Sequence, residues 1–353
     1  MKALVLSGGT GTRLRPLTYT SPKQLIPLAN KPIIIHVIEK VVQAGIHDIG
    51  IIVGDSQEEI KKEVGDGGRW HAKISYIYQS LPLGLAHAVK IAAPFIDGND
   101  FLMILGDNIF SMELSEFIGN FYLRRVNTSV LLHQVDKPAQ FGVAVVENDR
   151  ILKLVEKPKE FISDLILTGV YLFDKSIFAA IDQTVPSARG ELEITDAIQN
   201  QLQQGGKITY DLIKGWWKDT GNEQDILDAN RRILDDMENE MPEISDANSV
   251  LAGKLRIGKN VAISNSTIMG PAVIDEGSVI TNSFVGPYTC IGKGVKIQNC
   301  EVENCIILYG AQLDNVRKRI SNSLIGKNAV IKSFNKRPFS SAFVVADDSK
   351  IHL

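Results

Sequence analysis

The stretch Leu4–Pro32, LVLSGGTGTRLRPLTYTSPKQLIPLANKP, decides the fold of the first part of this 353-residue chain. The apolar run Ala3–Leu6 predicts a buried strand, and the small residues after it predict a tight turn of nearly bare backbone. Such a turn lets main-chain N–H groups approach an anion closely. Arg13 and Lys23 follow, and both are cations that suit phosphate oxygens. The stretch therefore predicts a strand-loop site for a nucleoside triphosphate.

Two common phosphate-binding motifs do not fit these glycines. A Rossmann fingerprint requires a small residue where Leu14 stands, and a Walker loop requires Gly-Lys-Ser/Thr, which does not follow at that spacing. For the glycines taken alone, an ordinary strand-to-helix turn remains an equal interpretation.

Composition and charge narrow the class of protein. The net charge of −3 gives no electrostatic reason to expect nucleic acid as a partner. The sequence contains no run of eighteen apolar residues, so no membrane span is expected, and no signal-like segment precedes the first strand. Cys290, Cys300 and Cys305 lack a C-x-x-C spacing, which favours a reducing cytoplasm and buried thiols over a zinc site.

The first two-thirds of the chain alternates predicted strands with predicted helices. The strands are expected at residues 3–6, 49–53, 74–78 and 101–105, and the helices at 33–44, 57–64 and 85–93. This order predicts an α/β fold with a Rossmann-like, mostly parallel sheet. Ligands of such sheets bind beyond the carboxyl ends of the strands. The glycine-rich turn, Gln79 and Asp107 each follow a strand, so we expect them at one crevice.

Two aspartates are candidate metal ligands, although the residues leave alternatives open. Asp107 ends the buried run LMILGD, where it would either cap a helix or hold Mg²⁺ together with substrate phosphates. Asp219 lies in GWWKDTGN, which is equally typical of a turn or a helix start.

The run GGTGTRLRP followed by SPKQLIP resembles the N-terminal signature of the sugar-1-phosphate nucleotidylyltransferases. The resemblance implies that the loop wraps the nucleotide phosphates, that Arg13 and Lys23 assist phosphoryl chemistry, and that Mg²⁺ is required. The loop residues to which it assigns nucleotide binding are Leu6, Ser7, Gly8, Gly9, Thr10, Gly11 and Thr12.

The resemblance extends to the base and the metal. QSLPLGLAHAV is similar to the family's base-reading segment, which implies that Gln79, Pro82 and Gly84 contact a pyrimidine. It also implies that Asp107, beside the nucleotide, and Asp219 jointly hold Mg²⁺.

The middle of the chain has family counterparts that line the sugar phosphate. The resemblance implies that Lys157 meets the sugar's phosphate and acts in catalysis, while Glu156 accepts hydrogen bonds from sugar hydroxyls. A solvated surface pair is the ordinary alternative for such an adjacent Glu-Lys. ELEITDAIQ also matches the family and is interpreted as a structural helix start. The implied sugar-phosphate residues are Asn108, Gly142, Glu156, Lys157, Leu167, Thr168, Tyr171 and Trp217.

The last third carries a repeat with an aliphatic residue every five or six positions. It resembles the left-handed parallel β-helix of hexapeptide-repeat proteins, with coils stepping through Ile257, Ile274, Ile291, Ile307 and Ile325. We therefore predict a nucleotidylyltransferase domain at 1–240 and a β-helix at 241–353. Some β-helix proteins are acyltransferases with a His base, but no His lies between His133 and His352. A scaffold with homo-oligomer contacts is the preferred role.

The resemblance covers nearly the whole chain and is strongest to members that transfer a thymidylyl group from dTTP to glucose 1-phosphate. It implies a Mg²⁺-dependent in-line attack that feeds deoxysugar biosynthesis of the dTDP-rhamnose type. UTP with glucose 1-phosphate and GTP with mannose 1-phosphate are the nearest alternatives, since Gln79 favours a pyrimidine without distinguishing thymine's methyl group. The intact Arg13, Lys23, Asp107 and Asp219 count against a non-catalytic regulator.

Overall fold

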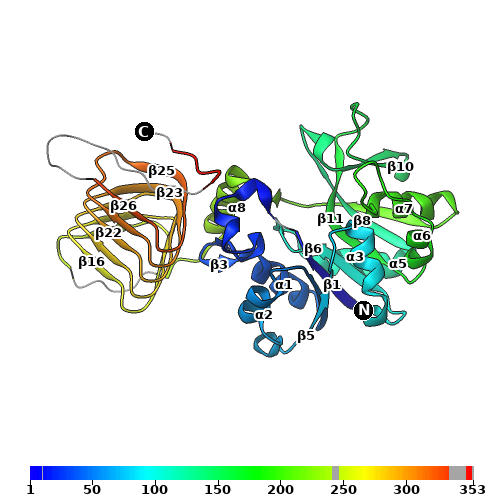
Figure 1. Cartoon of the computed structure of the whole chain (residues 1–353), viewed down its shortest axis with the longest axis horizontal. Coiled ribbons are helices and arrows are strands. Elements are labelled where there is room, and N and C mark those ends of the chain that lie inside the picture. The colour runs from blue at the N-terminus through cyan, green and yellow to red at the C-terminus, as the bar shows by residue number, and fades with distance from the viewer. Residues whose placement is uncertain (10, 241–245, 334–346, 352–353) are drawn as a thin grey trace. The chain divides into compact units, whose positions relative to one another are not determined.

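The computed structural model describes residues 1–9, 11–240, 246–333 and 347–351 (Figure 1). Its contacts form two compact units. The first comprises Met1–Thr10, Ser21–Leu25 and Ile33–Asp219, and the second comprises Gly11–Thr20, Ile26–Pro32 and Thr220–Leu353. Two short N-terminal segments thus group with the C-terminal part of the chain. The domain boundary drawn after residue 240 stays a prediction.

The first half of the large sheet is parallel, as the sequence predicts. Strand β1 pairs with β4 and β6, and β4 pairs with β5, all in parallel register. Their bounds are β1 (Lys2–Ser7), β4 (Asp48–Val53), β5 (Lys73–Tyr78) and β6 (Phe101–Leu105). The connecting helices are α1 (Ile33–Gln43), α2 (Gln57–Val64), α3 (Leu85–Ile91) and α4 (Ala93–Ile96). These predicted elements are confirmed to within a few residues.

The other half of this sheet is mixed, which corrects the expectation of a mostly parallel sheet. Strand β11 (Leu165–Phe173) pairs antiparallel with β6, β8 (Thr128–Gln134) and β9 (Gly142–Glu147). Strand β10 (Arg150–Glu156) returns antiparallel along β9, and β12 (Ile208–Leu212) runs parallel to β8. The β9–β10 turn at Asn148 and Asp149 has φ of 49° and 59°, and a turn of two residues joins only antiparallel strands.

The core of the first unit lies between this sheet and its helices. Within β1, Ala3, Leu4 and Val5 are fully buried, as expected for a strand covered on both faces. Phe101 and Phe173 pack against each other with ring centroids 5.4 Å apart. The remaining helices are α5 (Leu114–Arg124), α6 (Ile177–Asp182) and α7 (Ile194–Gln203). Within the described ranges, no helix is both long enough and apolar enough to cross a membrane.

The second unit is built from short stacked strands that follow helix α8 (Glu223–Asp235). They form two parallel sheets, and their register joins Ile257 to Ile274, Ile291, Ile307 and Ile325, the coil step that the repeat predicts. The strands are β14 (Val250–Ala252), β15 (Leu255–Ile257), β16 (Ala262–Ser264), β17 (Thr267–Met269), β18 (Ala272–Ile274), β19 (Val279–Thr281), β20 (Phe284–Val285), β21 (Thr289–Ile291), β22 (Lys296–Gln298), β23 (Glu301–Ile307), β24 (Gln312–Asp314), β25 (Ile320–Ile325) and β26 (Val330–Lys332).

Asparagines turn the same corner of four successive coils. Asn265, Asn282, Asn299 and Asn315 all have positive φ, which Asn tolerates better than most residues. Asn265, Asn282 and Asn299 each donate the side-chain amide to the next asparagine along the stack, at 2.8, 2.6 and 2.8 Å. The described coils are therefore consistent with a β-helix.

A short N-terminal hairpin completes the second unit. Strands β2 (Pro27–Leu28) and β3 (Lys31–Pro32) are joined by Ala29 and Asn30, whose φ values are 48° and 61°. The Ala29 N–H donates to Asn230 Oδ1 at 2.8 Å, and Arg256 Nη2 donates to the Ala29 carbonyl at 2.6 Å. These bonds hold an alanine in a conformation that favours glycine.

Candidate active site

A cavity of about 260 Å³ lies at the carboxyl ends of β1, β5 and β6. This is the edge at which the strand order predicts a ligand. Seven of the residues assigned to nucleotide binding line it, namely Leu6, Gly8, Gly9, Gln79, Pro82, Gly84 and Asp107.

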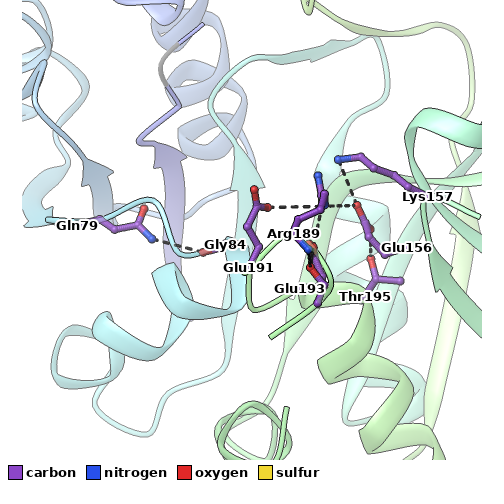
Figure 2. Close-up of polar contacts among 9 residues, drawn as sticks. Gln79, Gly84, Glu156, Lys157, Arg189, Glu191, Glu193 and Thr195 are labelled. Carbon is purple, nitrogen blue, oxygen red and sulfur yellow. Dashed lines mark hydrogen bonds and ion pairs between the residues drawn. The ribbon is translucent and has the colours of Figure 1, made fainter. Parts of the chain in front are cut away.

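Gln79 and Gly84 form one wall of this cavity (Figure 2). Gln79 Nε2 donates to the Gly84 carbonyl at 3.4 Å and lies 3.0 Å from His87 Nδ1. Gly84 has φ of 103°, and a Cβ atom there would lie 2.4 Å from the Leu192 carbonyl oxygen. Only glycine fits this backbone, so the wall depends on a residue without a side chain.

Gln24 also lines the cavity, and the sequence analysis did not single it out. Its side chain is buried, at 2 % exposure. Among the described residues, neither Gln24 Oε1 nor the buried Ser7 Oγ has a hydrogen-bond partner. A buried acceptor without a partner costs about 1–3 kcal/mol, which a ligand that donates a hydrogen bond would recover. Its position next to Lys23 in SPKQLIP was the signal available in the sequence.

Lys23, Asp107 and Asp219 form a charged cluster within the first unit. Lys23 Nζ lies 2.7 Å from Asp107 Oδ2 and 3.4 Å from Asp219 Oδ1. Asp219 reaches this position because β13 (Trp217–Asp219) pairs antiparallel with β7 (Asn108–Phe110) and sets Asp219 opposite Asn108. Asp107 thus lies between strands β6 and β7 and not at the start of a helix, and the two predicted metal ligands lie side by side.

The cluster keeps Lys23 positively charged. Burial by itself lowers the pKa of the Lys23 ammonium, but the charges and hydrogen bonds of Asp107 and Asp219 outweigh burial and raise the pKa above its ordinary value. A raised lysine pKa means that the protonated form persists throughout the neutral range.

The carboxylates of Asp107 and Asp219 suit a divalent cation, because both already lie close enough to contact one positive group, the Lys23 ammonium. Among the residues that the structure describes, no group of three or more His, Cys, Asp or Glu could hold a metal. Mg²⁺ is usually bound by only one or two carboxylates, with substrate phosphates and water completing its shell.

A second polar cluster lies around Glu156 (Figure 2). Glu156 lies opposite Gly142 in the β9–β10 register, and its Oε2 accepts a hydrogen bond from Thr195 Oγ1 at 2.7 Å. A Cβ atom on Gly142 would lie 2.7 Å from Thr195 Oγ1 and 3.0 Å from Glu156 Oε2. Gly142 therefore leaves the space in which the carboxylate and the hydroxyl meet.

Arg189 binds three carboxylates of this region, and the sequence analysis missed it. Its Nη2 lies 2.7 Å from Glu193, 3.4 Å from Glu156 and 3.5 Å from Glu191. Lys157 Nζ also lies 3.5 Å from Glu156 Oε1. Helix α7 does begin after Glu193, as predicted, but the same segment contributes Glu191 to the cavity wall.

The remaining residues assigned to the sugar phosphate are mostly buried supports. The Thr168 carbonyl accepts hydrogen bonds from Asn108 Nδ2 and, at 3.2 Å, from Trp217 Nε1. Thr168 Oγ1 donates to the Leu131 carbonyl at 2.9 Å. Burial raises the pKa of Tyr171 above its ordinary range, with the Glu156 charge adding to the shift. Leu167 is also buried. Direct contact of these residues with a sugar phosphate stays a prediction.

Three predicted phosphate-loop residues group with the second unit. Gly11 has φ of 62° and accepts the Leu14 N–H at 3.0 Å, which closes η1 (Thr12–Leu14). Arg13 is exposed. Thr10 lies outside the described residues, and the roles of Gly11, Thr12 and Arg13 toward a nucleotide stay predictions.

The cavity, the carboxylate pair and the sheet together define a phosphate-handling α/β enzyme. The family model for nucleotidyl transferases matches residues 2–236, so the chain belongs to this family and is a nucleotidyltransferase. This match and the full-length relatives described next together confirm the resemblance to sugar-1-phosphate nucleotidylyltransferases.

Particular relatives narrow the class further. The chain is 44% identical over 354 residues to a glucose-1-phosphate thymidylyltransferase of Streptomyces griseus, covering 100% of this chain and 99% of the relative. It is 40% identical over 358 residues to the low-salt glycan biosynthesis nucleotidyltransferase Agl11 of Haloferax volcanii, covering 100% of both. A Bacillus anthracis structure in complex with sucrose, provisionally named a glucose-1-phosphate thymidylyltransferase, has a TM-score of 0.63 at 37% identity, covering 68% of this chain and 98% of that one.

Proposed function

We propose that this nucleotidyltransferase transfers a thymidylyl group from dTTP to glucose 1-phosphate and releases pyrophosphate. The observation that carries the proposal is that the Gln79–Gly84 wall and Asp107 line the same cavity. That arrangement suits a pyrimidine nucleotide whose phosphates extend toward the carboxylate pair. The full-length likeness to the Streptomyces griseus thymidylyltransferase supports thymine and glucose over the alternatives.

The chemistry needs positioning and charge neutralisation from the protein. A phosphate oxygen of the sugar attacks the α-phosphorus, the bond between that phosphorus and the oxygen bridging to the β-phosphate breaks, and pyrophosphate departs in line. The attacking phosphate is already anionic near neutral pH, so no residue has to remove a proton. Two polyanions must instead be held together in reactive orientation.

Different residues are assigned to the different phosphate groups and to the metal. We assign Lys23 to the phosphates undergoing transfer, Lys157 to the sugar's phosphate, and Arg13 to the departing pyrophosphate. Asp107 and Asp219 would hold Mg²⁺, which supplies charge neutralisation at the phosphates when bound. Gln24 Oε1 lies at the cavity wall and accepts no hydrogen bond among the described residues, so it could accept one from a hydroxyl of the nucleotide.

The sugar end depends on a fixed carboxylate. Thr195 donates to one Glu156 oxygen, while Arg189 and Lys157 lie near the other. These contacts set the orientation in which Glu156 accepts hydrogen bonds from sugar hydroxyls.

The C-terminal coils are proposed to form a left-handed β-helix that serves as a scaffold and supports a homo-oligomer. The three cysteines are free and buried, which favours a reducing, cytoplasmic location. The sequence has no His between His133 and His352, so a His-dependent acyltransferase site in the coils is disfavoured.

A substrate matrix tests the function. Purified protein with Mg²⁺ is given each of four nucleoside triphosphates with glucose, mannose, galactose and glucosamine 1-phosphates, and pyrophosphate release is measured. We expect the highest kcat/KM for dTTP with glucose 1-phosphate, and no release in EDTA. A preference for UTP–glucose or GTP–mannose would reassign the substrates, and no release with any pair would overturn the proposal.

Two conservative variants test the metal assignment. We expect Asp107→Asn and Asp219→Asn each to lower kcat by roughly 100-fold or more, because a preorganised charge at the transferring phosphoryl group is lost. Thermal melting serves as the control. Variants that are inactive because they are unfolded would leave the assignment without support, and near-normal turnover would remove these residues from the mechanism.

A further inference from the structure

The Lys23 ammonium lies between the two carboxylates that are proposed to hold the divalent ion. Its Nζ is 2.7 Å from Asp107 Oδ2 and 3.4 Å from Asp219 Oδ1. The side chains are 9 %, 26 % and 30 % exposed for Lys23, Asp107 and Asp219. Because the Lys23 side chain is largely shielded from solvent, a divalent ion beside the same pair of oxygens would be repelled by its ammonium. The divalent ion and the ammonium therefore compete for one place.

We propose that Lys23 occupies the cation position while the enzyme is free of nucleotide, so that the divalent ion is taken up together with a nucleoside triphosphate and only weakly as a free ion. This inference rests on the proposed function. The triphosphate supplies further oxygen ligands for the ion and, at the same time, new acceptors for the displaced ammonium. Without it, displacement would leave a buried ammonium deprived of its counter-ions.

The local structure allows the side chain to move while the backbone stays in place. Lys23 begins η3 (Lys23–Leu25), where the Leu25 N–H donates to the Pro22 carbonyl at 2.9 Å. An ammonium on a flexible four-carbon stem can turn from one set of acceptors to another, which a planar guanidinium does less readily.

Binding of Mn²⁺ alone tests the competition. Free Mn²⁺ is titrated by electron paramagnetic resonance against metal-free, full-length wild type and Lys23→Met. We expect the variant to bind Mn²⁺ roughly 10- to 100-fold more tightly, as when one charge-assisted hydrogen bond no longer has to be broken. Lys90→Met is the matched control, because it also removes one positive charge, that of an exposed lysine on α3 paired with Asp182 at the end of α6. It should leave the affinity unchanged.

A second titration distinguishes two cases. Either the Lys23 ammonium must leave its position before the divalent ion binds, or it stays in place and only repels the ion. A non-hydrolysable dTTP analogue should tighten Mn²⁺ binding in the wild type by a much larger factor than in Lys23→Met, where no ammonium needs new acceptors. Equal coupling factors in the two proteins, or equal Mn²⁺ affinities without the analogue, would overturn the inference.

Two features keep the result interpretable. Lys23→Gln is measured in parallel in case Lys23→Met does not fold, as judged by thermal melting. The Mn²⁺ titration requires no turnover, so a wild type that fails the substrate matrix would overturn the proposed function without deciding the competition at Lys23.

Discussion

At Gly84 the backbone and its neighbours together exclude a side chain. We predict that Gly84→Ala raises the KM for dTTP about tenfold or more, because the new Cβ atom would lie 2.4 Å from the Leu192 carbonyl oxygen and displace the wall that carries Gln79. Initial rates at varied dTTP measure the effect.

Gly98→Ala provides the control for backbone strain alone. Gly98 has φ of 70°, and nothing lies within 4 Å of a Cβ atom built there. Gly98→Ala should lose about 1 kcal/mol of stability from its positive φ, and Gly84→Ala should lose more, because φ of 103° with ψ of 171° is a backbone conformation that essentially only glycine adopts. A Gly84→Ala protein with the KM and melting temperature of Gly98→Ala would show that the close approach does not shape the site.

Thr195 offers a test of how Glu156 is held. We predict that Thr195→Val raises the KM for glucose 1-phosphate about 10-fold and leaves the KM for dTTP unchanged, since it removes one hydrogen bond to a carboxylate while keeping the shape of the side chain. Pyrophosphate release at varied concentrations of each substrate separates the two constants. Thr184→Val removes a buried hydroxyl that donates to the Ala180 carbonyl instead, and it should change neither KM. A rise in both KM values for Thr195→Val would indicate general damage to the site.

Sequence patterns identify some site residues and miss others for a physical reason. Asp107 and Gln79 are predictable because each follows a strand, and strand ends of a parallel sheet share one edge. Arg189 and Glu193 belong to a charged run that looks the same whether it is solvated or folded into ion pairs. Gln24 becomes conspicuous only when burial removes the water that its carbonyl oxygen would otherwise bind.

At the scale of the elements, the coils bury all three cysteines, two of them in strands β21 and β23 and Cys300 just before β23. Burial raises the pKa of Cys290 to about 12 and that of Cys305 to about 11, and it also raises the pKa of Cys300. A thiol whose pKa is raised stays protonated to higher pH, and the thiolate is the reactive form.

The native protein is therefore predicted to react slowly with Ellman's reagent. At pH 8 we expect little colour on the time scale at which free cysteine reacts fully, and three equivalents once guanidinium chloride unfolds the chain. The native rate should stay low until the pH passes 9, the ordinary pKa of a thiol. One equivalent reacting at once in native protein would show that a coil opens or that a thiol is accessible.

The pairing direction of the strands is the feature of the fold that sequence reasoning misjudged. The coil register was predictable, because aliphatic side chains at a fixed step must fill the inside of each coil. The mixed half of the large sheet was not, because its direction depends on turns such as Asn148–Asp149, which is short enough to reverse the chain. An apolar run by itself carries no information about the direction of its neighbour.

At the scale of the whole molecule, segments that are far apart in the sequence belong to the same contact unit. The sequence places one boundary after residue 240, because composition changes there. The contacts group Gly11–Thr20 and Ile26–Pro32 with the second unit, while the boundary after residue 240 stays a prediction. No local pattern predicts this, since the Ala29 carbonyl meets an arginine 227 positions later in the chain.

This long-range contact predicts a coupling between Arg256 and the hairpin turn. Ala29 at φ of 48° is intrinsically unfavourable, and the bonds from Arg256 and to Asn230 offset that cost. We predict that Arg256→Met speeds amide hydrogen exchange in a peptide spanning residues 26–32 about tenfold, which corresponds to roughly 1.4 kcal/mol of local stability. In an Ala29→Gly background the same substitution should have a smaller effect, because glycine adopts positive φ without outside support.

Mass spectrometry of full-length protein measures the exchange in both backgrounds. The control is Arg319→Met, which removes an exposed arginine paired with Glu301 and Glu303. An equal effect of Arg256→Met in both backgrounds would mean that the arginine does not restrain this turn, and a matching effect of Arg319→Met would mean that any loss of charge loosens the unit.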